Sequence, residues 1–245
     1  MTTEPNWKTA FYNAYVSSGQ ATDTGQPAAD LFRPRKAFLT HIIATHLQPD
    51  RNSRIIDLAC GPGALLYFLD QAGYRNIAGV DVSAEQIAVA SRLGITSATC
   101  ATLEDFLAVQ PSTSADAVLA IDILEHLTRP QVMEVLASIR RVLKPGGRCV
   151  AHVPNGEGIY GNRIRYGDFT HELAFTQNSA RQVFRVAGFS KVNCYEDKPR
   201  VHGIVSLARR MIWDIGTLPD RLLWAAETGT PGAILSQNMM IVAIL

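Results

Sequence analysis

Short, mostly apolar runs alternate along this 245-residue chain with segments whose apolar residues repeat at helical spacing. Apolar runs without polar alternation are typical of strands that are covered on both faces of a parallel sheet. Such runs occupy residues 55–59, 115–121, 148–153 and 238–245. Amphipathic segments, with apolar residues three and four positions apart, occupy residues 34–47, 84–93, 129–143 and 176–188. This alternation of strands and helices predicts an α/β fold.

The segment at 54–83 is the most informative part of the pattern. It predicts a strand, the glycine turn CGPG, a helix and a second strand that ends at Asp81. Glycine lets the backbone approach a ligand closely, and the first turn of the following helix presents N–H groups to that ligand. We therefore expect Gly61 and Gly63 to contact a cofactor. We also expect that a side chain added at either position would occupy the space of the ligand.

Two classes of cofactor use such a unit. A dinucleotide fingerprint has a third glycine in G-x-G-x-x-G, and here that position holds Leu66. Asp81 suits ribose hydroxyls in either class, so it does not separate them. Asp57 does, because the pattern D-x-x-C-G-P-G resembles the first motif of class I S-adenosylmethionine-dependent methyltransferases.

Further motifs extend this resemblance. The sequences GVDVS, LEHL, LKPGG and HVPN, followed by the apolar C-terminal run, occur in the order that the methyltransferase sheet requires. The resemblance covers residues 54–195 and the last eight residues. It implies an α/β, Rossmann-like seven-stranded sheet with helices on both faces and an antiparallel last strand. The stretch from VPN through YGDFTHE is similar to small-molecule O-methyltransferases of the ubiquinone pathway and of bacterial surface-sugar and natural-product pathways.

The resemblance also implies which residues bind S-adenosyl-L-methionine. Asp81 would accept hydrogen bonds from the ribose, and the glycine turn would hold the methionine part. The adenine would lie along Thr102 and Leu103, where the family's usual aspartate is missing, so their backbone groups or Glu104 must recognise it. The complete set is Asp57, Ala59, Cys60, Gly61, Gly63, Asp81, Val82, Thr102, Leu103 and Asp122.

The two ends of the chain add further segments. Residues 1–50 combine aromatic residues, a polar loop and an amphipathic helix, and we interpret them as an N-terminal arm and helix that cover the cofactor cleft. A helix packed on the edge of the domain is the alternative. Residues 51–245 would form the methyltransferase domain. Within it, an insertion at about 197–237 predicts two helices joined near Gly216, whose apolar residues suit a core or a homodimer interface.

Methyl transfer from a sulfonium needs mainly in-line positioning of an acceptor about 3 Å from the methyl group. A hydroxyl acceptor additionally needs a base or a cation, and histidine is the natural base near neutral pH. His171, in the long loop after the fifth strand, and His126 are the candidate catalytic bases, with His152 expected at the same edge of the sheet. The alternative for each is a histidine that only bonds loop backbone.

Asp122, Glu125 and His126 follow the central strand at i, i+3 and i+4 spacing, which would place them on one side of a turn. Two carboxylates and an imidazole suit a hard cation such as Mg²⁺, with His152 or His171 completing the shell. The stretch resembles the E-x-x-E-H metal site of ubiquinone-pathway and some RNA 2′-O-methyltransferases, with Asp in place of the first Glu. The interpretation that we favour has Asp122 and His126 lining the cleft without a metal.

Composition limits the partners. The net charge is +1 and there is no basic tract, which argues against nucleic acid as a partner. No apolar run approaches 18 residues and the N-terminus lacks a signal-peptide pattern, so we expect no membrane span and a cytoplasmic protein. The four cysteines are widely spaced near predicted strands, as is typical of reduced core residues. The expected partner is a small-molecule acceptor.

The sequence therefore predicts an S-adenosylmethionine-dependent methyltransferase that acts on a hydroxyl of a small molecule such as a sugar or secondary metabolite. Three alternatives stay open. A dinucleotide-dependent oxidoreductase is disfavoured by Leu66 and by the LKPGG segment. A non-catalytic nucleotide-binding protein could use the same fold, and residues 205–224 could serve as an interaction module.

Overall fold

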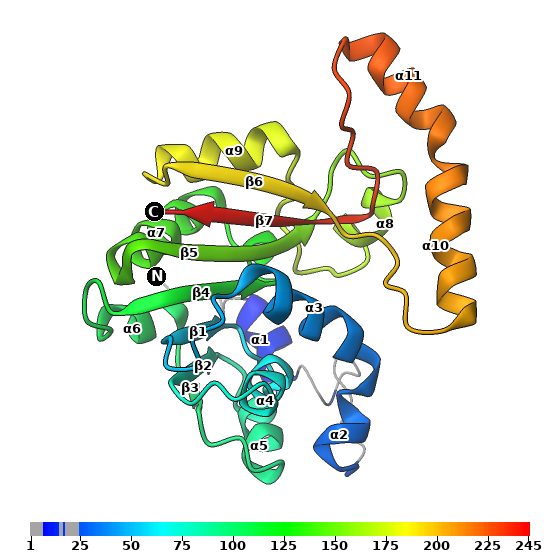
Figure 1. Cartoon of the computed structure of the whole chain (residues 1–245). Helices are drawn as coiled ribbons and strands as arrows, with labels where there is room; N and C mark the ends of the chain where they lie inside the picture. The colour runs from blue at the N-terminus through cyan, green and yellow to red at the C-terminus, as the bar shows by residue number, and fades with distance from the viewer. Residues whose placement is uncertain (1–6, 15–16, 18–24) are drawn as a thin grey trace.

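The computed structural model describes residues 7–14, 17 and 25–245, and these build one mixed sheet of seven strands (Figure 1). The strand order is β3-β2-β1-β4-β5-β7-β6. All neighbouring strands are parallel except at β7, which runs antiparallel to β5 and β6. The predicted fold class is confirmed. The strands are β1 Ile55–Leu58, β2 Ile77–Asp81, β3 Ala98–Cys100, β4 Ala115–Ile121, β5 Leu143–Pro154, β6 Lys191–Glu196 and β7 Asn238–Ile244.

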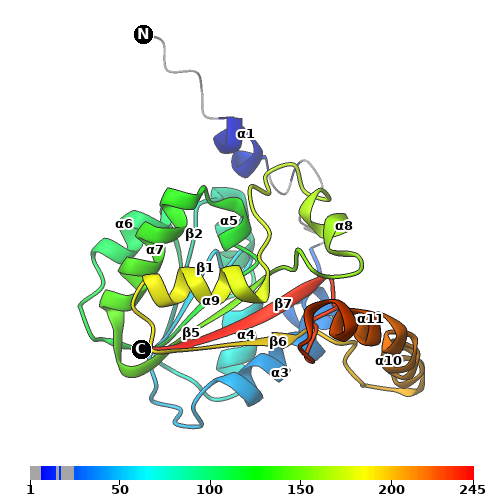
Figure 2. The same ribbon diagram turned by 90° about the horizontal axis from the view of Figure 1, so that it is seen from above.

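Helices cover both faces of the sheet (Figure 2). Helices α6, α7 and α9 pack on one face, and α3, α4 and α5 contribute to the core on the other. The α-helices are α1 Trp7–Asn13, α2 Ala28–Leu31, α3 Lys36–His46, α4 Ala64–Gln71, α5 Ala84–Arg92, α6 Leu103–Ala108, α7 Arg129–Val142, α8 Gly161–Arg165, α9 Gln177–Val186, α10 Ile204–Gly216 and α11 Leu218–Thr228. Two 3₁₀ turns, η1 Arg33–Arg35 and η2 Leu124–His126, precede α3 and α7.

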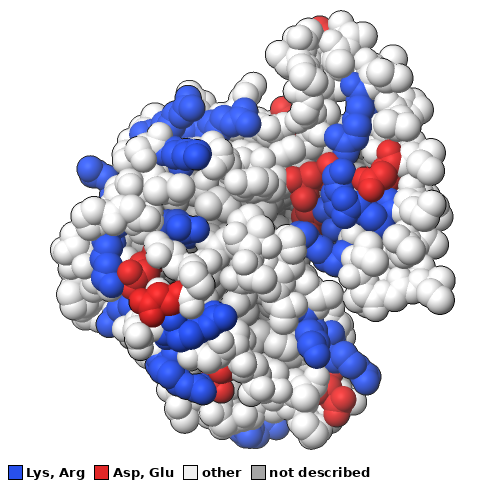
Figure 3. Space-filling view, in the orientation of Figure 1, with Lys and Arg blue, Asp and Glu red and all other residues white. Residues whose placement is uncertain are grey.

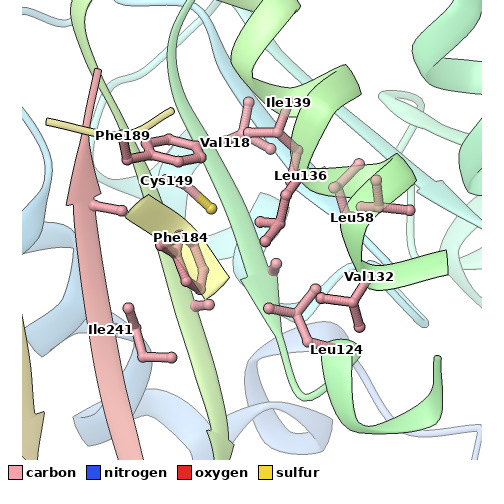
Figure 4. Packing of buried hydrophobic residues seen from close by; sticks show 14 of the residues in the cluster. Leu58, Val118, Leu124, Val132, Leu136, Ile139, Cys149, Phe184, Phe189 and Ile241 are labelled. Carbon is pink, nitrogen blue, oxygen red and sulfur yellow. The ribbon is translucent and has the colours of Figure 1, made fainter. Parts of the chain in front are cut away.

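The central strand β4 explains why the predicted strands are apolar at nearly every position. Val118 faces the core under α7 and α9, whereas its neighbour Leu119 faces the core under α3 and α4. Both side chains are fully buried, as are Leu136 of α7 and Phe184 of α9 on the first face (Figure 4). Because successive strand residues point to opposite faces, a strand between two helical layers must be apolar on both.

Polar caps start two helices directly after strands. The Ser83 hydroxyl accepts a hydrogen bond from the Gln86 N–H at 3.4 Å, and Thr102 accepts one from the Asp105 N–H at 3.1 Å. These two caps fix the N-termini of α5 and α6 at the carboxyl edge of the sheet.

The LKPGG segment is part of strand β5, ahead of the predicted strand at 148–153. Ala115 pairs with Leu143 and Ala117 with Arg148, so residues 144–147 bulge out of an otherwise continuous β5. Lys144 anchors the bulge through an ion pair with Asp116 at 2.7 Å. The strand is therefore longer than the predicted 148–153.

Smaller differences concern the third strand, the long loop and one cysteine. The third strand covers only Ala98–Cys100, and Ile95 ahead of it is buried against the glycine turn. The loop after β5 contains the short helix α8. All four cysteines are free, but Cys100 is exposed, so its interpretation as a core residue was wrong.

Helices α10 and α11 form an arm that projects from the body of the molecule (Figure 1). The predicted pair of helices within 197–237 is present, with the junction at Thr217. Among the described residues, no helix combines the length and the hydrophobicity that a bilayer crossing requires.

Candidate functional site

A first cavity of about 310 Å³ lies at the carboxyl edge of the sheet, where the strand order switches direction between β1 and β4. Ligands of open α/β sheets bind at such switch points, outside the carboxyl ends of the strands. Residues from the ends of β1, β2 and β4, from the η2 turn and from the helices α1, α5, α6 and α7 line it. They are Lys8, Tyr12, Ala59, Asp81, Val82, Ser83, Gln86, Thr102, Leu103, Glu104, Asp122, Ile123, His126, Leu127 and Gln131.

Asp81 joins the end of β2 to the glycine turn. One carboxylate oxygen accepts the N–H of Gly61 and the other accepts the N–H of Ser83, both at 2.8 Å. Burial raises the pKa of Asp81, and these two backbone bonds act in the opposite direction. The carboxylate is therefore held rigidly at the cavity wall, with lone pairs left for hydroxyl donors.

Asp57 lies behind this wall rather than in it. Its side chain is 3% exposed on β1. Burial raises its pKa to about 8, the Arg35 guanidinium lowers it and the neighbouring Asp81 carboxylate raises it further. Asp57 thus holds a proton at neutral pH that a nearby cation would displace.

The predicted binding residues divide into two groups. Those that line the first cavity are Ala59, Asp81, Val82, Thr102, Leu103, Asp122 and the candidate base His126. Those that do not line it are Asp57, Cys60, Gly61, Gly63 and the candidate base His171. Glu104, proposed as an alternative contact for an adenine ring, also lies in the wall.

The expectation about side chains at Gly63 requires correction. A Cβ there would lie 2.8 Å from Ile95 Cδ1, so it points into packed side chains and not into the cavity. At Gly61 a Cβ would meet the Gln86 side chain at 3.4 Å, and Gln86 does line the cavity. Both glycines have positive φ, 56° and 85°, which L-residues adopt only with strain. Substitution at Gly63 therefore disturbs packing before it disturbs a ligand.

A chain of charged groups lies beside the first cavity at the ends of β4 and β5. His152 Nδ1 bonds the Asp122 carboxylate, and its Nε2 lies 3.4 Å from Asp197. Burial alone would lower the pKa of His152, but Asp122 and Asp197 together raise it to about 10. Burial likewise opposes ionisation of Asp122, yet His152 and Arg35, whose Nη2 is 3.1 Å away, lower its pKa to about 2. His152 is thus a cation and not a base.

Glu125, His126 and His171 bring three ligand atoms within 4.8 Å of one another. The Thr170 hydroxyl donates to Asp168 at 2.6 Å, so it must accept from His126 Nδ1 at 2.7 Å, which leaves His126 Nε2 with its lone pair. His171 Nδ1 donates to the Ile164 carbonyl oxygen at 2.9 Å, so His171 Nε2 also keeps its lone pair.

Glu125 completes this cluster. Its side chain is 2% exposed, and its Oε2 has no hydrogen-bond partner among the described residues. Burial, and then the Asp122 charge, raise its pKa well above the usual range. Two imidazole lone pairs and an unpartnered carboxylate oxygen are a donor set that fits a divalent cation.

Asp122 is not part of this donor set, although its spacing from Glu125 predicted that it would be. Only Leu124–His126 forms a helical turn, and Asp122 has φ 57°, outside any helix. The i, i+3, i+4 rule therefore does not apply at Asp122. His171 takes the place of Asp122 in the donor set. The N–H groups of Glu172 and Leu173 donate to the Glu125 carbonyl and so hold the loop that carries His171 against Glu125.

Helix α1 closes one side of the first cavity. Lys8 donates to the His126 carbonyl at 2.7 Å and pairs with Glu172 at 2.9 Å. Trp7 and Phe11 pack on Phe169 with ring centroids 5.5 and 5.7 Å apart. The arm at 7–14 is thus fastened to the loop that carries His171. The remaining part of the predicted arm, at 1–6, 15–16 and 18–24, lies outside the described residues.

Comparison with known families gives the decisive observation. The family model described as "Methyltransferase domain" matches residues 55–147. The matched part is less than half of the chain, and it is similar to a methyltransferase domain. It runs from β1 through the glycine turn to the LKPGG bulge and supplies most of the wall of the first cavity.

One curated relative shares much of the chain. Methyltransferase phqN of Penicillium fellutanum is 24% identical over 210 residues, which is 84% of this chain. The match spans 61% of that relative, so this chain covers less than two thirds of its length.

Solved structures agree on the fold. A SAM-dependent methyltransferase from Archaeoglobus fulgidus has a TM-score of 0.66 at 19% identity, covering 89% of this chain and 97% of that one. Phosphoethanolamine N-methyltransferase 2 from Haemonchus contortus, in complex with S-adenosyl-L-methionine, has a TM-score of 0.62 at 17% identity, covering 95% and 59%. The seven-stranded sheet with its antiparallel last strand thus has the class I fold of these structures.

The sequence did not predict several residues that line the first cavity. Gln86 and Lys8 were not among the predicted residues. Tyr12 was one of the aromatic residues of the arm, which was the available signal. Arg35, which bonds Asp122, and Asp197, which lies next to His152, were missed too, because they come from distant segments with no motif of their own.

Proposed function

We propose that this chain transfers a methyl group from S-adenosyl-L-methionine to a small molecule. The observation that carries the proposal is Asp81 at the end of β2, bonded to the glycine turn and facing a cavity within the methyltransferase domain. In a methyltransferase this carboxylate would accept the ribose hydroxyls.

The rest of the first cavity suits the other parts of this cofactor. The adenine would lie along Thr102, Leu103 and Glu104 at the start of α6. The methionine part would lie at Ala59 and the glycine turn, where its ammonium would be attracted by the buried Asp57. The methyl group would then point toward Asp122, at the far end of the wall.

The chemistry asks little more of the protein than positioning. A lone pair on the acceptor forms the new bond to the methyl carbon, and the electron pair of the broken carbon–sulfur bond stays on sulfur. The products are the methylated acceptor and S-adenosylhomocysteine, and a proton must leave the acceptor. An acceptor held in line about 3 Å from the methyl carbon gains most of the acceleration from orientation.

We propose a hydroxyl as the acceptor group, with His126 taking its proton. His126 lines the cavity and its Nε2 carries a lone pair. Burial and the neighbouring His171 lower its pKa to about 4, so it is neutral at pH 7. His171 does not reach the cavity, and its ring centroid lies 4.6 Å from that of His126, so it would act by positioning His126.

A divalent cation is a second proposal for the same corner. Glu125, His126 and His171 would hold it, and when bound it would lower the pKa of an acceptor hydroxyl. Asp168 would support it through Thr170, in the way that outer partners fix a histidine ligand. Removal of metals by chelation followed by titration calorimetry with Mg²⁺ or Mn²⁺ should detect binding that Glu125→Gln abolishes. Full activity after chelation, without such binding, would leave His126 as the base.

Calorimetric titration with S-adenosylhomocysteine and with NADH tests the proposed function. We expect S-adenosylhomocysteine to bind and NADH not to bind; the reverse result would favour an oxidoreductase. Transfer of label from methyl-labelled S-adenosylmethionine to hydroxyl acceptors such as catechol then separates an enzyme from a binding protein. Cofactor binding without any transfer or turnover across the panel would favour the non-catalytic alternative.

A further inference from the structure

A second cavity of about 500 Å³ lies beside the first, above the ends of β4 and β5. Asp122 lines both cavities, so the two meet at the place where the methyl group would point. The α10 helix forms its outer wall, and segments next to η1, β6 and β7 form the rest. We call this second cavity the cationic cleft; its lining comprises Pro34, Arg35, Phe38, Asp122, His152, Tyr160, Asp197, Lys198, Pro199, Arg200, Arg209, Trp213, Ser236 and Gln237.

Positive charge predominates in this lining. Arg35, Lys198, Arg200 and Arg209 are accompanied by only two lining carboxylates, those of Asp122 and Asp197. Basic and acidic side chains gather in the hollow between the arm and the body of the molecule (Figure 3). The charged His152 lies between these two carboxylates and offsets part of their negative charge. The surplus of positive charge in the lining is therefore larger than a count of the arginines and the lysine against the carboxylates indicates.

Most of these cations have an acidic partner, but Arg209 has none among the residues that the structure describes. Arg35 pairs with Asp122 at 3.1 Å, and Arg200 pairs with Asp197 at 2.8 Å. Lys198 pairs with Asp214 at 3.0 Å, outside the lining. Within the described part of the chain, Arg209 has neither an ion pair nor a hydrogen bond. Its guanidinium is a fork of donors available to a carboxylate or a phosphate.

Two buried donors in the same wall also lack acceptors. Arg200 Nε and Trp213 Nε1 are shielded from solvent and have no hydrogen-bond partner among the described residues. A buried N–H without an acceptor loses its hydrogen bond to water and gains nothing in return, so such donors commonly mark a place where a ligand supplies the acceptor. Trp213 lies one helical turn from Arg209 on α10, so one anionic group could serve both.

We propose that the cationic cleft binds the methyl acceptor, and that this acceptor carries a carboxylate or a phosphate ester held by Arg209, Arg200 and Trp213. This deepens the proposed function and rests on it, because the reacting atom would sit near Asp122, where the first cavity opens. Phe38 and Tyr160 give the body of such an acceptor an aromatic surface between its charge and the reacting atom.

Binding of matched acids and neutral analogues to the S-adenosylhomocysteine-saturated protein tests this. Salicylate is compared with salicylamide, and phenyl phosphate with phenol, by titration calorimetry. We expect one of the two anions to bind at least tenfold more tightly than its neutral analogue, and the anion preferred tells a carboxylate site from a phosphate site. Equal binding of acids and neutral analogues would overturn the proposal.

Variants assign the binding to the cleft. Arg209→Gln should weaken anion binding about tenfold, and Trp213→Phe, which keeps the ring and removes the N–H, should weaken it a few-fold. Arg185→Gln, an exposed arginine on α9 away from both cavities, is the matched control and should change nothing. An Arg209→Gln variant with unchanged anion affinity, or a control that loses as much, would refute the site.

The titration also separates this proposal from the proposed function. Affinity for S-adenosylhomocysteine should be the same in Arg209→Gln as in the wild type, because Arg209 does not line the first cavity. Anion binding that depends on Arg209 in a protein that does not bind S-adenosylhomocysteine would refute methyl transfer and leave an anion site. Binding of S-adenosylhomocysteine without Arg209-dependent anion binding would refute the acceptor class alone.

Discussion

Asp81 has two tasks at the residue scale, because it holds the glycine turn as well as lining the first cavity. Asp81→Ala should weaken S-adenosylhomocysteine binding by about 2 to 4 kcal/mol, since a hydrogen bond to a charged acceptor contributes about 1.5 to 3 kcal/mol. It should also lower the free energy of unfolding, because the N–H groups of Gly61 and Ser83 lose their acceptor. Calorimetry and thermal unfolding measure the two effects. Asp70→Ala, an exposed carboxylate on α4, is the control, and a folded Asp81→Ala protein with normal affinity would refute the cofactor assignment.

The ion pair between His152 and Asp122 makes the free energy of unfolding depend on pH. The folded pKa of about 10 exceeds the usual value, so the stabilisation is complete below about pH 6.5 and is lost as the pH rises toward 10. We expect wild type to lose about 1 to 2 kcal/mol more than His152→Gln between pH 7 and 9.5, a modest amount because solvent screens the half-exposed Asp122 carboxylate. Urea unfolding at the two pH values measures the difference. An equal loss of unfolding free energy in wild type and His152→Gln would show that His152 is not charged in the folded protein.

At the scale of elements, the contact between α1 and Phe169 should govern how firmly the first cavity is closed. Phe169→Ala removes the ring that Trp7 and Phe11 pack on, so S-adenosylhomocysteine should bind about three- to tenfold more weakly and dissociate faster. Thermal unfolding should hardly change, because Phe169 is 77% exposed. Tyr166→Ala is the matched control, since Tyr166 is also 77% exposed on this loop but packs on Arg165. Unchanged dissociation kinetics in Phe169→Ala would show that α1 does not cover the cofactor.

At the scale of the whole molecule, the arm turns its apolar side chains outward. Trp213 and Ser206 face the body, while the opposite faces of α10 and α11 are exposed. Burying one such side chain removes on the order of 100 Å² from water, and a standard interface needs about 800 Å² per partner. The exposed apolar side chains of the arm supply an area of this size. They are Ile204, Val205, Leu207, Met211, Ile212, Ile215, Leu218, Leu222 and Leu223.

We therefore expect the chain to form a homodimer through the outer faces of α10 and α11. Ile212→Glu with Leu222→Glu should convert it to a monomer in light scattering after size exclusion, because two buried charges per protomer would oppose pairing. Val109→Glu, which replaces a 77% exposed apolar residue at the end of α6, should leave the dimer intact. A wild-type protein that is monomeric at micromolar concentration would contradict the prediction.

The sequence by itself determined the features that depend on neighbours along the chain. The apolar runs of β1, β4, β5 and β7 are strands because both of their faces are covered, and such a strand cannot carry the polar alternation of an exposed one. The glycine turn, the caps at Ser83 and Thr102, and Asp81 at a strand end followed from local chemistry in the same way.

Tertiary structure alone decided which distant side chains meet. The periodicity that relates Asp122 to Glu125 holds only inside a helix, and the left-handed residue at Asp122 broke it. His152 and Arg35 reach Asp122 from segments up to 87 residues away in sequence, Asp197 reaches His152, and His171 reaches His126 through a docked loop. The path of a loop depends on what it packs against, which is a property of the assembled fold, so no spacing in the sequence could have revealed the cationic cleft or its unpaired Arg209.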